Sequence, residues 1–149
     1  MQHIRQANKE DVSRIAEILV FNNRVNFYPL FRNDAYSFHE LQVIPIANEY
    51  LHNQEILQNT YVYDDGIIRG FIRIEENEIK KLFVDTFFQG RGIGEKLLKF
   101  AINEKNTTFL WALEKNTRAI NFYQRHGFQL TNHKIPEKGT TEYLVRLEY

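Results

Sequence analysis

The sequence contains no cysteine, which excludes disulfides, thiolate metal sites and cysteine nucleophiles. It has no apolar run of membrane-spanning length, and its first residues do not resemble the apolar core of a signal peptide. Nineteen basic and nineteen acidic side chains give a formal net charge of zero. Dedicated nucleic-acid-binding proteins usually carry a basic excess or a basic stripe, and this chain shows neither. We therefore expect a cytoplasmic protein without a nucleic-acid or membrane partner, although a local charged pocket remains compatible with this composition.

What is present is an ordinary globular composition, with 43% hydrophobic and 26% charged residues in a chain of 149. We find no internal repeat, low-complexity segment or linker, so we expect residues 1–149 to form a single domain. The five histidines lack the spacing of a zinc site, and we expect no metal.

Hydrophobic periodicity and turn residues predict the element order βααβββαβαββ, an α/β fold of the α+β type with a mixed sheet. The predicted strands are 1–6, 60–64, 67–74, 78–84, 107–113, 128–135 and 142–149. The predicted helices begin after Asn8, cover about 41–57, follow the glycines at 90–94, and begin after Asn116. The aromatic-rich segment 21–40 is predicted to be irregular and to form a pocket for a small or hydrophobic amine, although such aromatics more often only cover a sheet.

The strand at 78–84 has two features that bear on function. Its apolar positions change parity between Ile79 and the pair Leu82 and Val84, which a β-bulge or burial on both faces would produce. A crossover helix separates this strand from the one at 107–113, and this connection favours a parallel pair.

The loop Gln89-Gly90-Arg91-Gly92-Ile93-Gly94 places three glycines between a strand and a helix. Glycine permits positive φ and close approach of the backbone to a ligand, and a helix start offers unpaired N–H groups to phosphate. A dinucleotide fingerprint fails because Glu95 replaces its third glycine, and a P-loop fails because Gly94 is not followed by Lys-Ser or Lys-Thr. A tight turn without a ligand is the alternative.

Two motifs together resemble the GNAT family of N-acetyltransferases. The loop at 89–94 is similar to the family signature Q-x-x-G-x-G, and the segment from Asn116 to Phe128 resembles N-x-x-A-x-x-F-Y-x-x-x-G-F. The resemblance is strong over about 78–130. It implies a sheet splayed into a V between the strands at 78–84 and 107–113, with helices on its flanks and acetyl-CoA in the opening.

The resemblance also implies the binding residues. The pyrophosphate would meet the N–H groups of the loop and of the first helical turn, with Arg91 as an added cation, and the pantetheine arm would run along the strand at 78–84. The expected acetyl-CoA-binding residues are Leu82, Phe83, Val84, Gln89, Gly90, Arg91, Gly92, Ile93, Gly94, Glu95, Asn116 and Tyr123. Asn116 also suits a helix N-cap.

Acetyl transfer to an amine requires a base, an oxyanion donor and an acid for the leaving thiolate. The resemblance implies that Tyr123 is the acid and that the N–H of Val84 is the oxyanion donor; a core tyrosine is the alternative for Tyr123. Glu78 matches the glutamate of the histone acetyltransferase branch, eleven residues before Gln89, and is the candidate base. An exposed turn carboxylate and a base-free water chain are the alternatives. Trp111 occupies the position of the glutamate used by ribosomal-protein acetyltransferases.

The implied function is N-acetyl transfer from acetyl-CoA by direct attack in a ternary complex, with an amine-bearing small molecule or peptide as acceptor. An acyl-CoA sensor or a non-catalytic GNAT-like module is the alternative. An enzyme acting on nucleotide phosphates is disfavoured by the two failed loop spacings. Monomer and homodimer both remain open.

Overall fold

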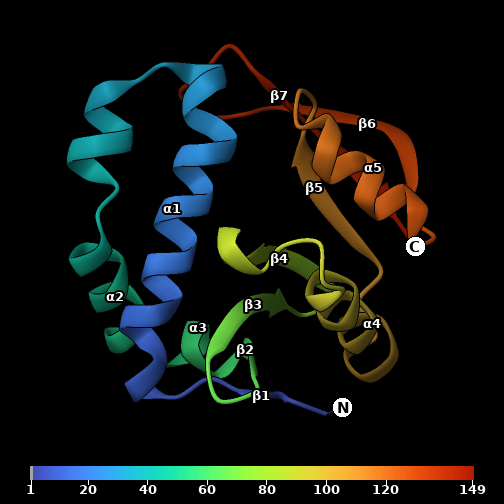
Figure 1. Cartoon of the computed structure of the whole chain (residues 1–149). Helices are drawn as coiled ribbons and strands as arrows, with labels where there is room; N and C mark the ends of the chain where they lie inside the picture. Colours follow the sequence, from blue (N-terminus) through green and yellow to red (C-terminus); the bar gives the residue numbers. More distant parts are fainter. Residues whose placement is uncertain (1) are drawn as a thin grey trace.

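The computed structural model describes residues 2–149 and contains a seven-stranded sheet in the order β1-β2-β3-β4-β5-β7-β6 (Figure 1). The strands are β1 (Ile4–Gln6), β2 (Thr60–Asp64), β3 (Ile68–Glu75), β4 (Glu78–Val84), β5 (Phe109–Leu113), β6 (Gln129–Pro136) and β7 (Tyr143–Glu148). The α-helices are α1 (Val12–Phe31), α2 (Val43–His52), α3 (Gln54–Gln58), α4 (Ile93–Lys105) and α5 (Thr117–Arg125). Short helical turns are η1 (Lys9–Asp11), η2 (Ala35–Glu40) and η3 (Thr86–Phe88). The predicted mixed fold and element order are confirmed, with the predicted helix at 41–57 divided at Asn53 into α2 and α3.

The segment 21–40 is mostly helical, so the prediction of an irregular segment is wrong. Helix α1 continues to Phe31, and the π-helical turn η2 follows it. The aromatic rings of Tyr28 and Phe38 pack edge to face with centroids 5.0 Å apart, which joins α1 to η2. The sequence pattern failed here because these aromatics lie outside the apolar stripe that α1 turns toward the sheet. Tertiary packing then outweighs their modest helix propensity.

The helices cover both faces of the sheet. Helices α1 and α2 lie on one face, at the left of Figure 1, and α4 lies on the other. Phe83 of β4 packs in the cluster on the α1 side, whereas Leu82 and Val84 pack in the cluster on the α4 side. Strand β4 therefore turns alternate side chains toward two different helical layers.

A β-bulge at Lys80 explains the parity change in β4. Arg73 of β3 pairs with Lys81, but the next residue of β3, Ile74, pairs with Ile79, so Lys80 has no partner in the register. The extra residue brings Ile79 onto the same face as Leu82 and Val84. The predicted bulge is confirmed.

The sheet opens where β4 passes this bulge. Strands β4 and β5 run parallel but pair only as Glu78 with Phe109 and Ile79 with Leu110. Beyond these two positions β5 continues along β7 while β4 turns away from it (Figure 1). The predicted V-shaped opening between these strands is confirmed.

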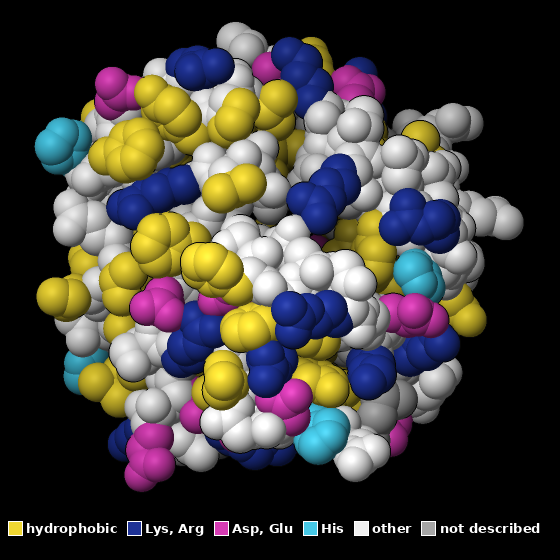
Figure 2. Space-filling model, viewed as in Figure 1, with side chains coloured by type: hydrophobic (Ala, Val, Ile, Leu, Met, Phe, Trp, Pro, Cys, Tyr) yellow, Lys and Arg dark blue, Asp and Glu magenta, His cyan; other side chains and the backbone are white. Residues whose placement is uncertain are grey.

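The surface in Figure 2 shows Lys and Arg side chains interspersed with Asp and Glu, without a large field of one sign on this face. None of the helices within residues 2–149 is both long and apolar enough to span a membrane.

Candidate active site

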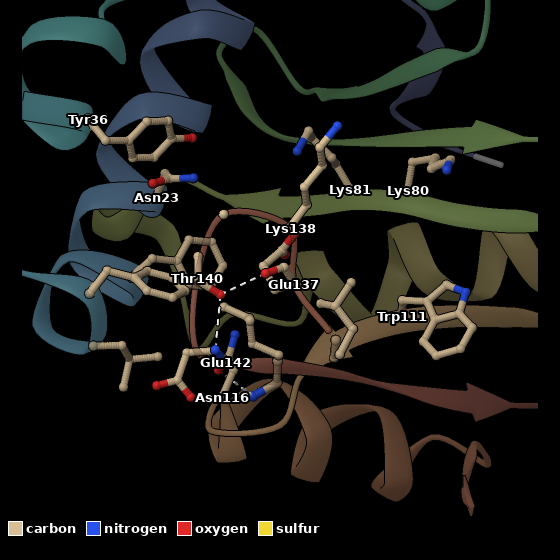
Figure 3. Close-up of a pocket in the computed structure, with 18 of the residues that line it drawn as sticks. Asn23, Tyr36, Lys80, Lys81, Trp111, Asn116, Glu137, Lys138, Thr140 and Glu142 are labelled. Atoms are coloured by element: carbon tan, nitrogen blue, oxygen red, sulfur yellow. Dashed lines mark hydrogen bonds between the residues drawn. The ribbon is translucent and has the colours of Figure 1, made fainter. Parts of the chain in front are cut away.

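A cleft of about 720 Å³ lies where β4 and β5 separate. One wall is formed by residues 79–83 of β4, and a second by residues 110–113 of β5 together with Asn116, Ala119 and Tyr123. The C-terminal half of α1 with η2, and the β6–β7 turn at 137–142, close the remaining sides (Figure 3). The aromatic segment thus contributes Phe27, Phe31 and Tyr36 to the cleft, as the sequence predicted for a pocket.

The backbone of β4 faces this opening at Leu82 and Val84. The carbonyl of Val84 accepts hydrogen bonds from the side-chain amides of Asn22 and Gln89, each at 3.0 Å. The following residue turns to the opposite edge, since the Asp85 N–H donates to the Arg69 carbonyl next to β3 at 2.8 Å. Alternate residues of a strand direct their N–H and C=O groups to opposite edges. The N–H groups of Leu82 and Val84 therefore point toward the opening.

Gln89, the first residue of the glycine-loop motif, connects the β4 side of the V to α5 on the other side through hydrogen bonds. Its Nε2 also donates to Asn22 Oδ1 at 3.2 Å, and its Oε1 accepts from Arg118 Nη2 at 2.9 Å. Asn22 is only 3% exposed, and it donates to the Ile18 carbonyl at 2.9 Å as well. The Gln89 side chain is thus committed to the protein, and its predicted contact with acetyl-CoA remains a prediction.

The sequence analysis did not predict Asn22 or Arg118 as residues of the site, although the spacing of one helix gave an indication for Asn22. It continues the apolar spacing of Ile15 and Leu19, so a polar residue stands on the buried face of an amphipathic helix. Buried amides are normally hydrogen-bonded, and this position therefore indicated a polar partner in the core.

The glycine loop leaves room for a ligand. Gly90 and Gly92 have φ of 78° and 81°, and a Cβ on either would meet no atom within 4 Å. Gly92 is the N-cap of α4 and provides no side chain to cap it, so the first N–H groups of the helix stay available. Arg91 lies beside them, with its guanidinium 5.5 Å from the Phe88 ring centroid. This combination suits a phosphate group.

Gly94 and Glu95 have other surroundings. A Cβ on Gly94 would lie 3.5 Å from Phe122 and 3.6 Å from Val84, which are ordinary van der Waals distances, so the start of α4 lies against α5 and β4 but leaves room for a small side chain. The Glu95 carboxylate pairs with Lys99 at 2.8 Å. Their predicted share in acetyl-CoA binding would come through backbone N–H groups and remains a prediction.

Tyr123 stands on the wall opposite β4. Its ring is 8% exposed and packs against Phe122 and Phe128, with centroids 5.2 and 5.6 Å away. Its hydroxyl makes no hydrogen bond to any residue between 2 and 149. Burial raises the pKa of Tyr123, so the phenol stays protonated at neutral pH. Asn116 lies nearby in the lining and caps α5, because its Oδ1 accepts from the Ala119 N–H at 3.2 Å.

Comparison with known proteins assigns this arrangement to a family. Residues 57–130 match the family model described as an acetyltransferase (GNAT) domain. The chain belongs to the GNAT family. The matched domain and the relatives, which are named as N-acetyltransferases, identify it as an N-acetyltransferase of that family.

Three GNAT relatives show the extent of the similarity. Peptidyl-lysine N-acetyltransferase YiaC of Escherichia coli K12 is 28% identical over 131 residues, covering 87% of this chain and 84% of the relative. Spermine/spermidine N(1)-acetyltransferase of Bacillus subtilis 168 is 37% identical over 46% of this chain and 57% of its own length. The PaiA N-acetyltransferase of Thermoplasma acidophilum, solved with coenzyme A, has a TM-score of 0.70 at 19% identity and covers 98% of both chains.

Glu78, the candidate base of this GNAT chain, lies at the closed end of the V. It pairs in register with Phe109, and its carboxylate is 3.3 Å from the ammonium of Lys80. Glu78 does not contribute to the lining of the cleft. Its role as base remains a prediction, and this placement weakens the support for it.

Acidic groups from η2 and from the β6–β7 turn lie close to Tyr36. Burial raises the pKa of Tyr36, and the nearby Glu40 and Glu137 carboxylates raise it further, against a hydrogen bond from Asn23. Figure 3 shows Tyr36 and Asn23 next to each other on the α1 side of the cleft. Within the described chain, 2–149, no group of three or more acidic or histidine side chains is arranged to hold a metal ion.

Proposed function

We propose that this protein transfers an acetyl group from acetyl-CoA to a primary amine by direct attack in a ternary complex, with residues 1–149 acting as one domain. The observation that carries the proposal is the opening itself. Backbone N–H groups of β4 face a cleft from one wall, and the free hydroxyl of Tyr123 lines the other. A thioester between them would have a donor for its oxyanion and an acid for its sulfur.

Acetyl-CoA fits the α4 side of this opening. The uncapped start of α4 and the open space above Gly90 and Gly92 suit its pyrophosphate. The edge of β4 at 82–84 suits the amide-bearing pantetheine arm, which would bind as an added strand. The coenzyme A bound by the Thermoplasma acidophilum relative supports this donor.

In the proposed reaction, the Val84 N–H stabilises the oxyanion of the tetrahedral intermediate, and Tyr123 donates a proton to the leaving thiolate. Leu82, Phe83 and Asn116 position the pantetheine arm. The assignments of Leu82 and Val84 draw on the direction of the β4 edge, and those of Tyr123 and Asn116 on their place in the cleft lining. The backbone groups of Phe83 face β3, so its part in binding rests on the motif resemblance alone.

The acceptor is an amine-bearing small molecule or peptide. Relatives are named for peptidyl-lysine and for spermine or spermidine, and both contain primary amines. The acceptor would enter from the side of α1, η2 and the β6–β7 turn, opposite the glycine loop. A cytoplasmic location, the absence of nucleic-acid and membrane partners, and a monomeric or homodimeric state remain predictions.

The test is the release of free thiol from acetyl-CoA in the presence of spermidine, a lysine-containing peptide, an aminoglycoside and free amino acids. We expect thiol release that depends on one of these amines, with acetylated product detected by mass spectrometry. The alternative function, an acyl-CoA sensor, predicts stabilisation by acetyl-CoA without amine-dependent turnover. That second pattern would reject the enzyme proposal and keep the binding site.

Replacing Glu78 with Gln tests the base that the motif implies. If Glu78 takes the proton of the acceptor, the variant should show a lower kcat and an altered pH–rate profile. Glu75→Gln is the matched control, since the Glu75 carboxylate is 3.8 Å from the same Lys80 ammonium. Equal rates and profiles in both variants would remove Glu78 from the mechanism, which is the outcome that its position favours.

A further inference from the structure

Lys81 is an unpaired cation inside the cleft. It follows the bulge residue of β4 and lines the opening (Figure 3). Its ammonium makes no hydrogen bond or ion pair with any residue in the range 2–149. The neighbouring Lys80, in contrast, lies 3.3 Å from Glu78 and 3.8 Å from Glu75. An ammonium in a partly desolvated cleft is costly when nothing compensates its charge.

The surroundings of Lys81 favour its neutral form. Burial lowers the pKa of Lys81, and Arg73, its cross-strand partner on β3, lowers it further, as does Lys80. Glu49 of α2 and Glu137 of the β6–β7 turn act in the opposite direction, but the net shift is downward. Arg73 is itself fixed, because its Nη1 donates to the Tyr50 hydroxyl at 3.2 Å. A lysine with a lowered pKa carries a larger fraction of free amine at neutral pH.

Lys81 also has the right position. It shares the α1-side face of β4 with Phe83, so its side chain projects toward the acceptor side of the cleft. It directly precedes Leu82, whose N–H points into the opening where the thioester would lie. Of the other groups able to accept a proton, Glu78 lies outside the lining and Glu142 is held by Lys115 at 2.8 Å. Glu40 and Glu137 lie near Tyr36, and the Glu137 carboxylate also acts on Lys81.

We propose that Lys81 is the general base that deprotonates the ammonium of the acceptor. This inference rests on the proposed acetyl transfer. The Lys81 amine takes one proton from the acceptor, whose free amine then attacks the thioester carbonyl. As the C–N bond forms and the C–S bond breaks, Tyr123 gives its proton to sulfur and regains one from the nitrogen of the intermediate. Lys81 then releases its proton to water, so each turnover yields the amide, the thiol of CoA and one proton.

The first experiment replaces Lys81 with Met, which keeps the length of the side chain and removes the amine. We expect kcat to fall about 10²–10⁴-fold with spermidine or a lysine peptide as acceptor. Lys105→Met, at the C-terminal end of α4 and outside the cleft lining, is the control and should retain most of the activity. Lys81→Arg should not restore the rate, because a guanidinium remains protonated and cannot accept a proton. Stabilisation by acetyl-CoA should persist in all three variants.

A second acceptor amine, which is already neutral, distinguishes proton removal by Lys81 from any other role of this residue. Trifluoroethylamine is mostly neutral at neutral pH because its fluorines withdraw electrons, so its attack needs less help from a base. The ratio of wild-type to Lys81→Met rates should therefore be much smaller with this amine than with spermidine. Recovery of activity in Lys81→Arg would overturn the proposal and indicate that the charge of Lys81 binds an anionic group of the acceptor.

A direct titration covers the case in which Lys81 variants fail to fold. Reductive methylation of the wild-type protein with ¹³C-formaldehyde labels its lysines for NMR, and Lys80→Arg and Lys81→Arg spectra assign the two signals. Lys81 should titrate at a lower pH than Lys80, and an ordinary lysine pKa would overturn the proposal. Full kcat in Lys81→Met would overturn it while leaving the acetyltransferase function intact. Acetyl-CoA binding without any turnover by the wild type would overturn both.

Discussion

Tyr123→Phe is expected to lower kcat by about 10²–10⁴-fold, the usual contribution of a general acid. The change removes one hydroxyl that lines the cleft and bonds to no described residue, and it keeps the ring that packs on Phe122 and Phe128. Stability and the Kd for acetyl-CoA should change little, because the hydroxyl acts mainly as the C–S bond breaks. The measurements are steady-state kinetics, calorimetric binding and thermal unfolding of the same preparations.

The raised pKa of Tyr123 sets the size of this effect. A buried phenol is fully protonated at neutral pH, but it is a weaker acid than a thiol, whose pKa is about 8.5. Proton transfer therefore has to accompany the departure of the thiolate. With an acyl donor that has a better leaving group, Tyr123→Phe should lower kcat by a smaller factor. Tyr143→Phe, an exposed residue of β7, is the control. A folded Tyr123→Phe enzyme with near-normal kcat would show that Tyr123 is structural and that water protonates the thiolate.

Gly92→Val should abolish most of the stabilisation that acetyl-CoA gives. A ligand at one hundred times its Kd adds about 2.7 kcal/mol to the free energy of unfolding, which a thermal shift assay detects readily. A valine side chain at position 92 would fill open space beside the first N–H groups of α4, where the pyrophosphate is proposed to bind. The expected result is a folded protein whose melting temperature barely responds to acetyl-CoA.

Position 92 has φ of 81°, a value that a β-branched residue such as valine rarely adopts, so Gly92→Val also strains the backbone. The control variant must therefore introduce the same kind of strain elsewhere. Gly66, in the β2–β3 turn, has φ of 108°, and a Cβ at this position would also meet no atom within 4 Å. Gly66→Val therefore suffers similar strain far from the glycine loop. That variant should melt at a lower temperature but respond fully to acetyl-CoA. A full response in Gly92→Val would separate the loop from phosphate binding.

Much of the framework was predictable because it depends on local signals. The bounds of β2 and β4 match those predicted, since turn residues frame each strand. The bulge left a trace in the parity of Ile79 and Leu82, and the glycine loop was evident from residue types that permit positive φ. Each of these features is determined within a few consecutive residues.

The parts that escaped prediction depend on contacts between distant segments. The bonds among Asn22, Gln89 and Arg118 join residues up to 67 positions apart, and no spacing rule relates them. The isolation of Lys81 follows from where carboxylates on α2 and the β6–β7 turn come to lie, which the chain reveals only when folded. The placement of Glu78 at the closed end of the V likewise follows from strand pairing that its motif position does not specify.

The single extra residue at position 80 has a consequence for altering the range of amines accepted. After the bulge, the even positions 82 and 84 pack toward α4, and the odd positions 81 and 83 face the layer of α1. Acetyl-CoA is proposed to use backbone groups of this strand, which every amino acid except proline supplies in full. The side chain at position 83 can therefore be exchanged to reshape the amine site while the donor contacts stay constant, whereas Lys81 has to be kept as the proposed base. Deleting Lys80 would leave Ile79 and Lys81 paired with Ile74 and Arg73 in a regular register, so we expect both sets of side chains to keep their faces and only the local bend of the bulge to be lost.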